Sequence, residues 1–195
     1  MHHGYFWKGE DPRIIGIKRR RLQALWQAEM SLLAYHLPLD VHTKWGNNVQ
    51  LAKRLDWMLS KQVRVDGVPG LLCSGSLPEL SSIVTLTEKL TNSLGQVPLV
   101  IAPEDWDQEK ACIDRIAWCT GAAQRYFQKA IDLGAQAFFT GEISESTVHL
   151  AREAGACFFA CGHHATEKYG VQAVGHALKE TFGIEVQFFD EENPV

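Results

Sequence analysis

Hydrophobic residues in the second half of the chain follow two alternating patterns. Apolar runs of four to six residues are separated by longer stretches in which apolar positions recur every three to four residues. The short runs predict buried strands and the longer stretches predict amphipathic helices. This alternation is typical of a largely parallel sheet covered on both faces. We therefore predict strands at 116–120, 137–140, 157–160 and 184–189, with helices at 122–133, 144–154 and 166–182.

The first half of the chain has a weaker pattern. Leu22, Leu25, Trp26 and Met30 recur with helical period and predict a helix over 17–30. The short apolar segment that follows it ends before a proline, which favours a buried strand at 31–36. The remaining predictions are helices at 46–56 and 78–91 and strands at 71–73 and 97–101, while 57–69 is ambiguous.

Two segments of the second half repeat one arrangement. "DLGAQAFFTGE" at 132–142 and "EAGACFFACGH" at 153–163 each run from a helix end through glycine, an apolar strand and a second glycine to a polar residue. Ligands of open α/β sheets bind beyond the carboxyl ends of the strands. The repeat therefore places Glu142 and His163 where chemistry is expected.

Composition is that of a globular protein. The chain has 195 residues, of which 46% are hydrophobic and 22% charged, so disorder and low complexity are excluded. The longest stretch without a charged residue, 90–103, is shorter than the roughly 20 residues that span a bilayer. With no signal-like start either, we expect a cytoplasmic protein without a membrane partner.

Charge and cysteine content remove further classes. A net charge of -4 makes nucleic acid an unexpected partner, and the basic run at 18–21 fits a solvated helix face better than a phosphate-binding stripe. Five cysteines, with no C-x-x-C pair, argue against both a disulfide framework and a zinc ribbon.

Histidines carry the candidate chemistry. His2 and His3 are adjacent, and Glu167 follows His163 by four residues, a spacing that puts an imidazole and a carboxylate on one helix face. Asp40 follows another predicted strand. Each feature has a plainer interpretation: a tag remnant or frayed start for the first pair, a helix-start hydrogen bond for the second, and a turn for Asp40.

Four separated motifs together resemble one family: "HHGYFWKGE" at 2–10, "HLPLDVHTKWGNN" at 36–48, "TGEISESTVHLARE" at 140–153 and "GHHATEKYG" at 162–170. They resemble the NGG-interacting-factor-like family, whose bacterial members are called GTP cyclohydrolase 1 type 2 homologues. The resemblance covers residues 2–195. It implies a homohexamer and a dinuclear metal site with His2, His3, Asp40, His163 and Glu167 as ligands.

Neighbouring residues are expected to have lesser roles. Glu142 fits a general base or a partner that orients a ligand, although a carboxylate near a helix N-terminus has the same sequence signature. His36, His149 and His164 fit either ligand-orienting or ordinary polar roles. Cys161 fits a buried thiol at a strand end.

The chain departs from this family at its start. Family members carry a segment before the paired histidines, whereas here Met1 directly precedes His2. Ordering ligands at a free terminus costs about 1 to 2 kcal/mol per residue. We therefore expect lower stability and weaker metal binding than in a longer relative.

These observations lead to one prediction of fold and two of function. The fold is a three-layer α/β protein of two similar lobes, 1–110 and 111–195, with the metal site in the cleft between them. The first function is a metal-dependent hydrolase that uses two divalent ions, Zn, Mn, Fe, Co or Ni, on an anionic or heterocyclic small molecule such as a nucleotide. The alternative is a non-catalytic metal-holding or regulatory interaction protein.

Overall fold

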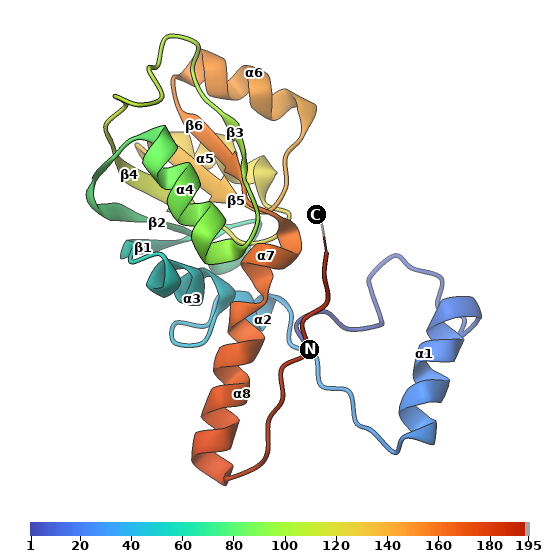
Figure 1. Ribbon diagram of the computed structural model, residues 1–195. Helices are drawn as coiled ribbons and strands as arrows, with labels where there is room; N and C mark the ends of the chain where they lie inside the picture. Colours follow the sequence, from blue (N-terminus) through green and yellow to red (C-terminus); the bar gives the residue numbers. More distant parts are fainter. Residues whose placement is uncertain (194–195) are drawn as a thin grey trace.

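The computed structural model describes residues 1–193. Its elements form one mixed sheet with helices packed against it (Figure 1). In chain order they are α1 (Gly16–Gln27), α2 (Leu37–Asp40), α3 (Asn47–Arg54), β1 (Met58–Val65), β2 (Val68–Ser81), α4 (Ile83–Leu94), β3 (Leu99–Ile101), β4 (Ile113–Trp118), the 3-10 helix η1 (Gln124–Tyr126), α5 (Phe127–Asp132), β5 (Ala137–Thr140), α6 (Glu145–Ala154), β6 (Cys157–Ala160), α7 (His163–Glu167) and α8 (Tyr169–Phe182).

The sheet has six strands in the order β1-β2-β4-β5-β6-β3. Only β4, β5 and β6 run parallel to their neighbours in this group; β1 with β2, β2 with β4 and β3 with β6 are antiparallel. The prediction of a largely parallel sheet is therefore wrong. One reason is the segment 57–69, which the sequence left unassigned. Its turn at Asp66 and Gly67 joins β1 and β2 as a hairpin, and the two strands of a hairpin are antiparallel.

Both faces of the sheet are covered, as predicted for an α/β protein. Phe138 and Phe158 face a core shared with α5 and α6, whereas Phe139 and Phe159 face a second core shared with α3, α4 and the start of α8. Adjacent phenylalanines reach opposite cores because successive strand residues point to opposite faces. All four side chains are at most 1% exposed. The three-layer α/β class is thus confirmed.

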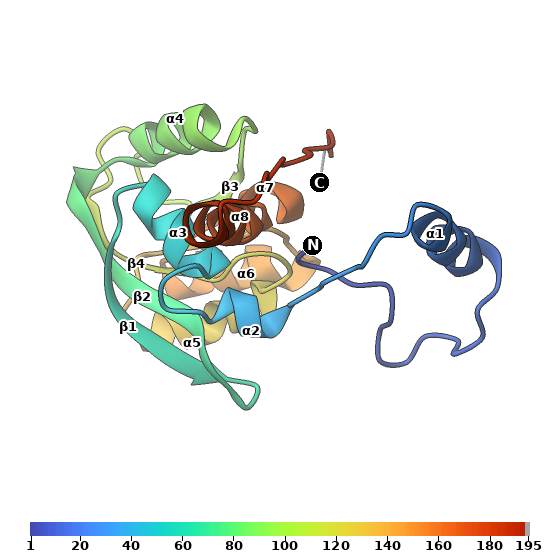
Figure 2. The same cartoon turned by 90° about the horizontal axis from the view of Figure 1, so that it is seen from below.

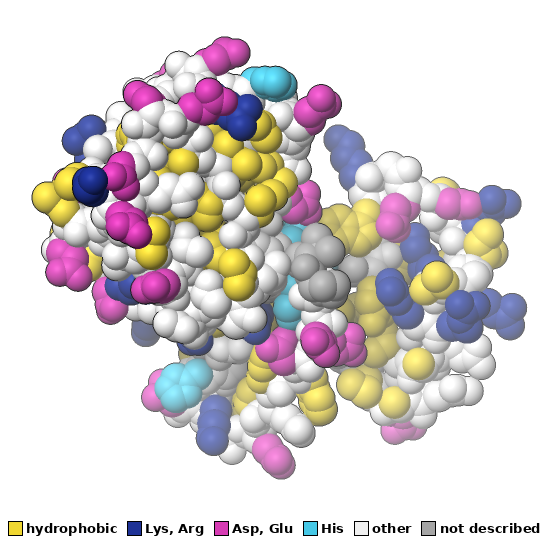
Figure 3. Space-filling model, turned by 45° about the horizontal axis from the view of Figure 1, so that its top comes forward, with side chains coloured by type: hydrophobic (Ala, Val, Ile, Leu, Met, Phe, Trp, Pro, Cys, Tyr) yellow, Lys and Arg dark blue, Asp and Glu magenta, His cyan; other side chains and the backbone are white. Residues whose placement is uncertain are grey.

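Residues 4–35 form an arm that extends away from this body. Figures 1 and 2 show α1 at the end of the arm, apart from the sheet in both views. None of the residues of α1, all of which lie in the described part of the chain, is buried. Hydrophobic and basic side chains lie exposed on the arm (Figure 3). The exposed hydrophobic residues there include Phe6, Ile17 and Trp26.

Most predicted elements of the second half are confirmed, and two predicted strands are wrong. The strands at 137–140 and 157–160 have the predicted bounds, and the helix predicted at 166–182 is divided at Lys168 between α7 and α8. Segments 31–36 and 184–189 are apolar as expected, but neither is a strand in the described structure. An extended segment needs a hydrogen-bonded neighbour to become a strand, and neither segment adds to the six-stranded order.

The division into two lobes remains a prediction. Strands from residues 1–110 and from residues 111–193 share the one sheet, and residues 194–195 of the second lobe lie outside the described residues. Across residues 1–193, the structure contains no helix with the length and apolar character needed to cross a bilayer.

Candidate metal centre

The parallel strands β4, β5 and β6 deliver polar residues to one edge of the sheet. Gly121 follows β4, Glu142 follows β5 and His163 follows β6. Because parallel strands end at the same edge, these three loops meet, as expected for α/β proteins. Gly141 donates a backbone hydrogen bond to Gly121 O at 2.8 Å, and Gly162 donates one to Gly141 O at 3.0 Å.

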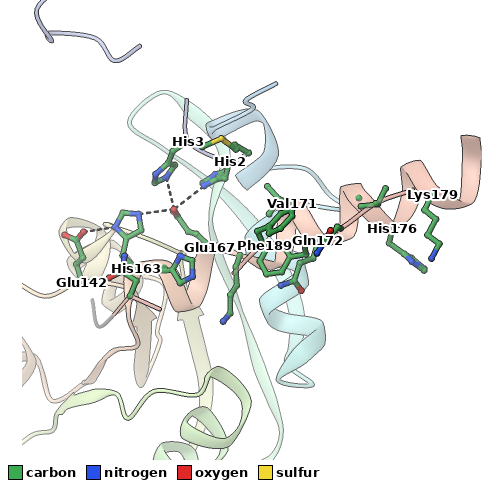
Figure 4. A pocket seen from close by; sticks show the side chains of 18 residues that line it. His2, His3, Glu142, His163, Glu167, Val171, Gln172, His176, Lys179 and Phe189 are labelled. Carbon is green, nitrogen blue, oxygen red and sulfur yellow. Dashed lines mark hydrogen bonds and ion pairs between the residues drawn. The ribbon is translucent and has the colours of Figure 1, made fainter. Parts of the chain in front are cut away.

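The short helix α7 presents His163 and Glu167 one turn apart. Its N-cap, Gly162, has φ +92°, a conformation that favours glycine. His163 Nε2 lies 2.9 Å from Glu167 Oε2, and His163 Nδ1 lies 2.7 Å from Glu142 Oε1. Glu142 therefore fixes the His163 ring and leaves Nε2 facing Glu167 (Figure 4).

Glu167 is the meeting point of three imidazoles. Its Oε2 atom lies 2.9 Å from His163 Nε2, 2.9 Å from His3 Nε2 and 3.2 Å from His2 Nδ1. Figure 4 shows these rings pointing toward the same carboxylate. The carboxylate side chain is only 10% exposed, so the charges are partly removed from water.

His2 is placed between two carboxylates. Its Nε2 atom lies 2.9 Å from Asp40 Oδ1, while Nδ1 faces Glu167. Asp40 itself is buried at the end of α2, where Asn47 Nδ2 donates a hydrogen bond of 2.7 Å to its Oδ1. The first residues of the chain are thus held at the strand ends through His2.

His36 also belongs to this group, although the sequence alone assigned it only a lesser role. One ligand atom from each of His2, His3, His36 and Glu167 can be chosen so that all four lie within 4.8 Å of one another. The His36 ring lies 4.8 Å from that of His2 and 4.6 Å from that of His3, centre to centre. The available signal was its position four residues before Asp40, the same spacing that separates His163 from Glu167.

Electrostatic effects in this group follow from the mixture of imidazoles and carboxylates. Burial lowers the pKa of His2, but the adjacent carboxylates of Asp40 and Glu167 outweigh it and raise that pKa to about 9. The hydrogen bond to Glu167 also raises the pKa of His163 to about 9. Burial raises the pKa of Glu167, but the adjacent imidazoles of His163, His2 and His3 hold it well below its usual range.

The chemistry of the donor atoms fits a divalent cation. His2 Nε2 and His3 Nε2 are buried, and neither has a partner of good hydrogen-bond geometry among the described residues, although each lies 2.9 Å from a carboxylate oxygen. An imidazole nitrogen and a carboxylate oxygen that both point at one cation, rather than at each other, lie close together but are poorly aligned for a hydrogen bond. Mixed imidazole and carboxylate ligands suit Zn, Mn, Fe, Co and Ni.

The structure brings the sequence-predicted residues together. His2, His3, Asp40, His163 and Glu167 form one connected group through the contacts above, and whether they hold metal remains a prediction. Glu142 joins this group through His163.

Other candidates lie apart from the group or are buried. His164 bonds Asp190 at 2.7 Å, His149 is exposed on α6, and Cys161 is a buried thiol. The basic run at 18–21 lies in α1, on the arm.

A pocket of about 930 Å³ opens beside this group. Glu142, His163 and Glu167 line one end, and His176 and Lys179 lie farther along α8 (Figure 4). Lys168, which joins α7 to α8, also lines the pocket. The apolar residues Val171, Val186, Phe188 and Phe189 also line it. The pocket therefore combines ligand atoms, basic groups and apolar surface.

These features define an α/β protein with a histidine and carboxylate cluster at the carboxyl ends of its parallel strands. The model of the Duf34/NIF3 (NGG1p interacting factor 3) family matches residues 1–194, and the chain belongs to this family. This confirms the resemblance seen in the sequence motifs.

Relatives with known names are similar over the whole chain. A protein of Pseudomonas aeruginosa named "GTP cyclohydrolase 1 type 2 homolog" is 48% identical over 194 residues, which are 100% of this chain and 75% of the relative. One from Allochromatium vinosum with the same name is 45% identical, covering 100% of this chain and 74% of its own length. The chain thus spans about three quarters of these relatives.

Solved structures show the same fold. Protein ybgI, whose function is described as unknown, has a TM-score of 0.91 and 40% identity, with 100% of this chain and 75% of that chain covered. TTHA1606 from Thermus thermophilus has a TM-score of 0.79 and 31% identity, with 100% and 74% covered. The mixed α/β fold is therefore that of the family.

Proposed function

We propose that the chain binds two divalent metal ions and is a hydrolase that acts on a nucleotide or a related heterocycle. The observation that carries the proposal is the convergence of three imidazoles on Glu167 Oε2 from two distant segments, 2–3 and 163. Asp40 extends the same group by one carboxylate through His2. The names of the relatives agree with a nucleotide-directed activity.

The residues of the chain would divide the work among them. His2, His3, Asp40, His163 and Glu167 would hold the ions, with His36 near enough to join them. When bound, such ions supply a Lewis acid and a water of lowered pKa. Glu142 would accept a hydrogen bond from His163 Nδ1–H, which leaves the lone pair of Nε2 for a cation.

Glu142 can also take a proton during the reaction. Its side chain is 35% exposed and lines the pocket, so its carboxylate is accessible to a bound molecule. This accessibility supports the prediction that it is the general base.

Pocket composition supports the substrate class. Lys179 supplies positive charge for an anionic group, and Phe188 supplies an aromatic face for a planar ring. Five unpaired cysteines support a location in the reducing cytoplasm.

The proposal is tested by metal analysis of the purified protein, followed by a hydrolysis screen across a nucleotide panel. His163→Ala and Glu167→Ala should lose bound metal and any hydrolysis together. His149→Ala, a change of an exposed histidine on α6, is the matched control and should retain both. Hydrolysis that survives in the Glu167 variant would remove this group from the mechanism.

A second candidate function, a regulatory interaction protein, is favoured by the arm. Apolar side chains such as Trp26, which is 72% exposed, need a covering surface. Residues 4–36 carry six Lys and Arg against three Asp and Glu, whereas the rest of the chain carries thirteen against twenty. We propose that the basic arm docks on the acidic body of a second copy, within the homohexamer that the family resemblance implies.

The mass of the protein in solution tests this self-association. Light scattering should give a multiple of the 21.8 kDa chain mass, which Trp26→Glu should reduce. Gln27→Glu adds the same charge on the same helix without removing an apolar side chain, and should leave the mass unchanged. A parent protein that remains monomeric at all concentrations would refute the docking.

A further inference from the structure

Asn47 connects two parts of the candidate metal centre that lie far apart in the sequence. Its Nδ2 donates to Asp40 Oδ1 at 2.7 Å, and its Oδ1 accepts from the backbone N–H of Gly170 at 2.8 Å. Gly170 lies in the first turn of α8, three residues after Glu167. One fully buried side chain therefore links the carboxylate of α2 to the helix that follows the carboxylate of α7.

Two glycines make this link possible. A Cβ atom at Gly46 would lie 2.6 Å from Asp40 O and 2.7 Å from Leu39 O, so a larger residue would push α3 away from α2. A Cβ atom at Gly170 would lie 2.6 Å from Asn47 Oδ1. The backbones of α2, α3 and α8 approach closely only because both positions lack a side chain.

We propose that Asn47 is a positioning residue that sets the distance and orientation of Asp40 relative to Glu167. This inference rests on the proposed function, because it takes both carboxylates to be metal ligands. The amide fixes the carboxylate of Asp40 by a hydrogen bond to the oxygen that also faces His2. Partners that orient ligands in this way typically change metal affinity by about 10 to 100-fold when they are removed.

Asn48 provides a matched comparison. It stands next to Asn47 in the first turn of α3, and its side chain is also fully buried with two hydrogen bonds. Asn48 Nδ2, however, donates to Leu71 O at 2.9 Å, and Asn48 Oδ1 accepts from Thr120 N at 2.9 Å, so neither bond reaches a proposed ligand. A purely structural role predicts similar effects at the two positions.

The experiment is a Co²⁺ titration of the metal-free protein, followed by visible absorption, with thermal unfolding measured in parallel. Asn47→Ala and Asn48→Ala should both lower the unfolding temperature of the metal-free chain. Asn47→Ala should weaken Co²⁺ binding by about 10 to 100-fold, and Asn48→Ala, which removes no contact with a proposed ligand, should leave it unchanged.

Gly170→Ala guards against an Asn47 variant that fails to fold. Alanine suits a helix, and the overlap it creates is with Asn47 rather than with a ligand. It should also weaken Co²⁺ binding at least tenfold, the lower end of the range for an orienting partner. A parent that binds no Co²⁺ would sink the proposed metal centre and this role with it. A parent that binds Co²⁺, with equal affinities in the Asn47 and Asn48 variants, would sink the role of Asn47 alone.

Discussion

Gly121→Ala is expected to weaken metal binding strongly because residue 121 packs directly against the side chain of Glu167. A Cβ atom there would overlap Glu167 Oε1, lie 2.6 Å from Glu167 Cδ and lie 3.2 Å from His163 Nε2. The backbone is not free to move away. Gly121 N donates to Thr166 Oγ1 at 3.1 Å, and Gly121 O accepts from Gly141 N at 2.8 Å.

The expected magnitudes can be worked out from this geometry. Gly121 has φ +70°, so alanine costs roughly 1 to 2 kcal/mol of unfolding free energy from the backbone alone. The overlap is relieved by turning the Glu167 carboxylate away from His2, His3 and His163, and breaking such buried pairs costs about 3 to 5 kcal/mol more. Metal affinity should fall by at least about 100-fold, since a ligand is displaced rather than merely misaligned.

Gly134→Ala is the matched control for this change. Gly134 has φ +82°, but beyond its two chain neighbours no described atom lies within 4 Å of a Cβ placed there. Gly134→Ala should therefore lower the unfolding free energy by about 1 to 2 kcal/mol, from the backbone alone, and leave the metal affinity unchanged. Denaturant unfolding and Co²⁺ titration of both variants separate the two effects. If the Gly121 variant kept the metal affinity of the parent, Glu167 would not be a metal ligand in the position described.

Three further predictions concern thiols, a helix cap and bound metal. With a thiol reagent at pH 8, native protein should react only at the exposed Cys112, because burial raises the pKa of Cys73 and Cys157 to about 12 and leaves little thiolate; reaction at all five sites before unfolding would contradict the packing. Ser82→Ala should lower the unfolding free energy by about 1 kcal/mol in denaturant titrations, because Ser82 Oγ accepts a hydrogen bond from Thr85 N at the start of α4. Ser93→Ala, later in the same helix, should leave the unfolding free energy unchanged. Equal effects of the two changes would exclude a capping role for Ser82. If the cluster holds metal, divalent cation at 100 times its dissociation constant should stabilise the protein by about 2.7 kcal/mol, and a chelator should reverse this in thermal unfolding; no shift would indicate that the folded chain does not bind it.

Sequence patterns predicted the second half of the fold because each element there carries its own signal. The paired phenylalanines of β5 and β6 indicate strands buried on both faces, and the structure confirms them. Segments 31–36 and 184–189 carry the same apolar signal, yet pairing depends on a neighbouring strand that periodicity does not report. Antiparallel pairing of β3 with β6 was equally invisible, because strand direction depends on the path of the connecting chain.

Candidate site residues were only partly accessible to spacing. The four-residue interval marked His163 with Glu167, but the contact of His2 with Asp40 joins the two ends of the arm and came to light only through family resemblance and then geometry. His36 was assigned only a lesser role and Asn47 was missed, because their importance lies in distances to residues elsewhere in the chain. A histidine and an asparagine near a turn have many ordinary roles.

Histidines at both roots of the arm give the cluster a mechanical consequence. His2 and His3 stand where the arm leaves the body, and His36 stands where it returns. Joined through one ion, His2 and His36 would close a ring of about 34 residues in the folded chain, so that the arm would be a closed loop held at both of its ends. Loading the cluster would then tether the arm as a staple does, and stripping it would give the arm a longer reach.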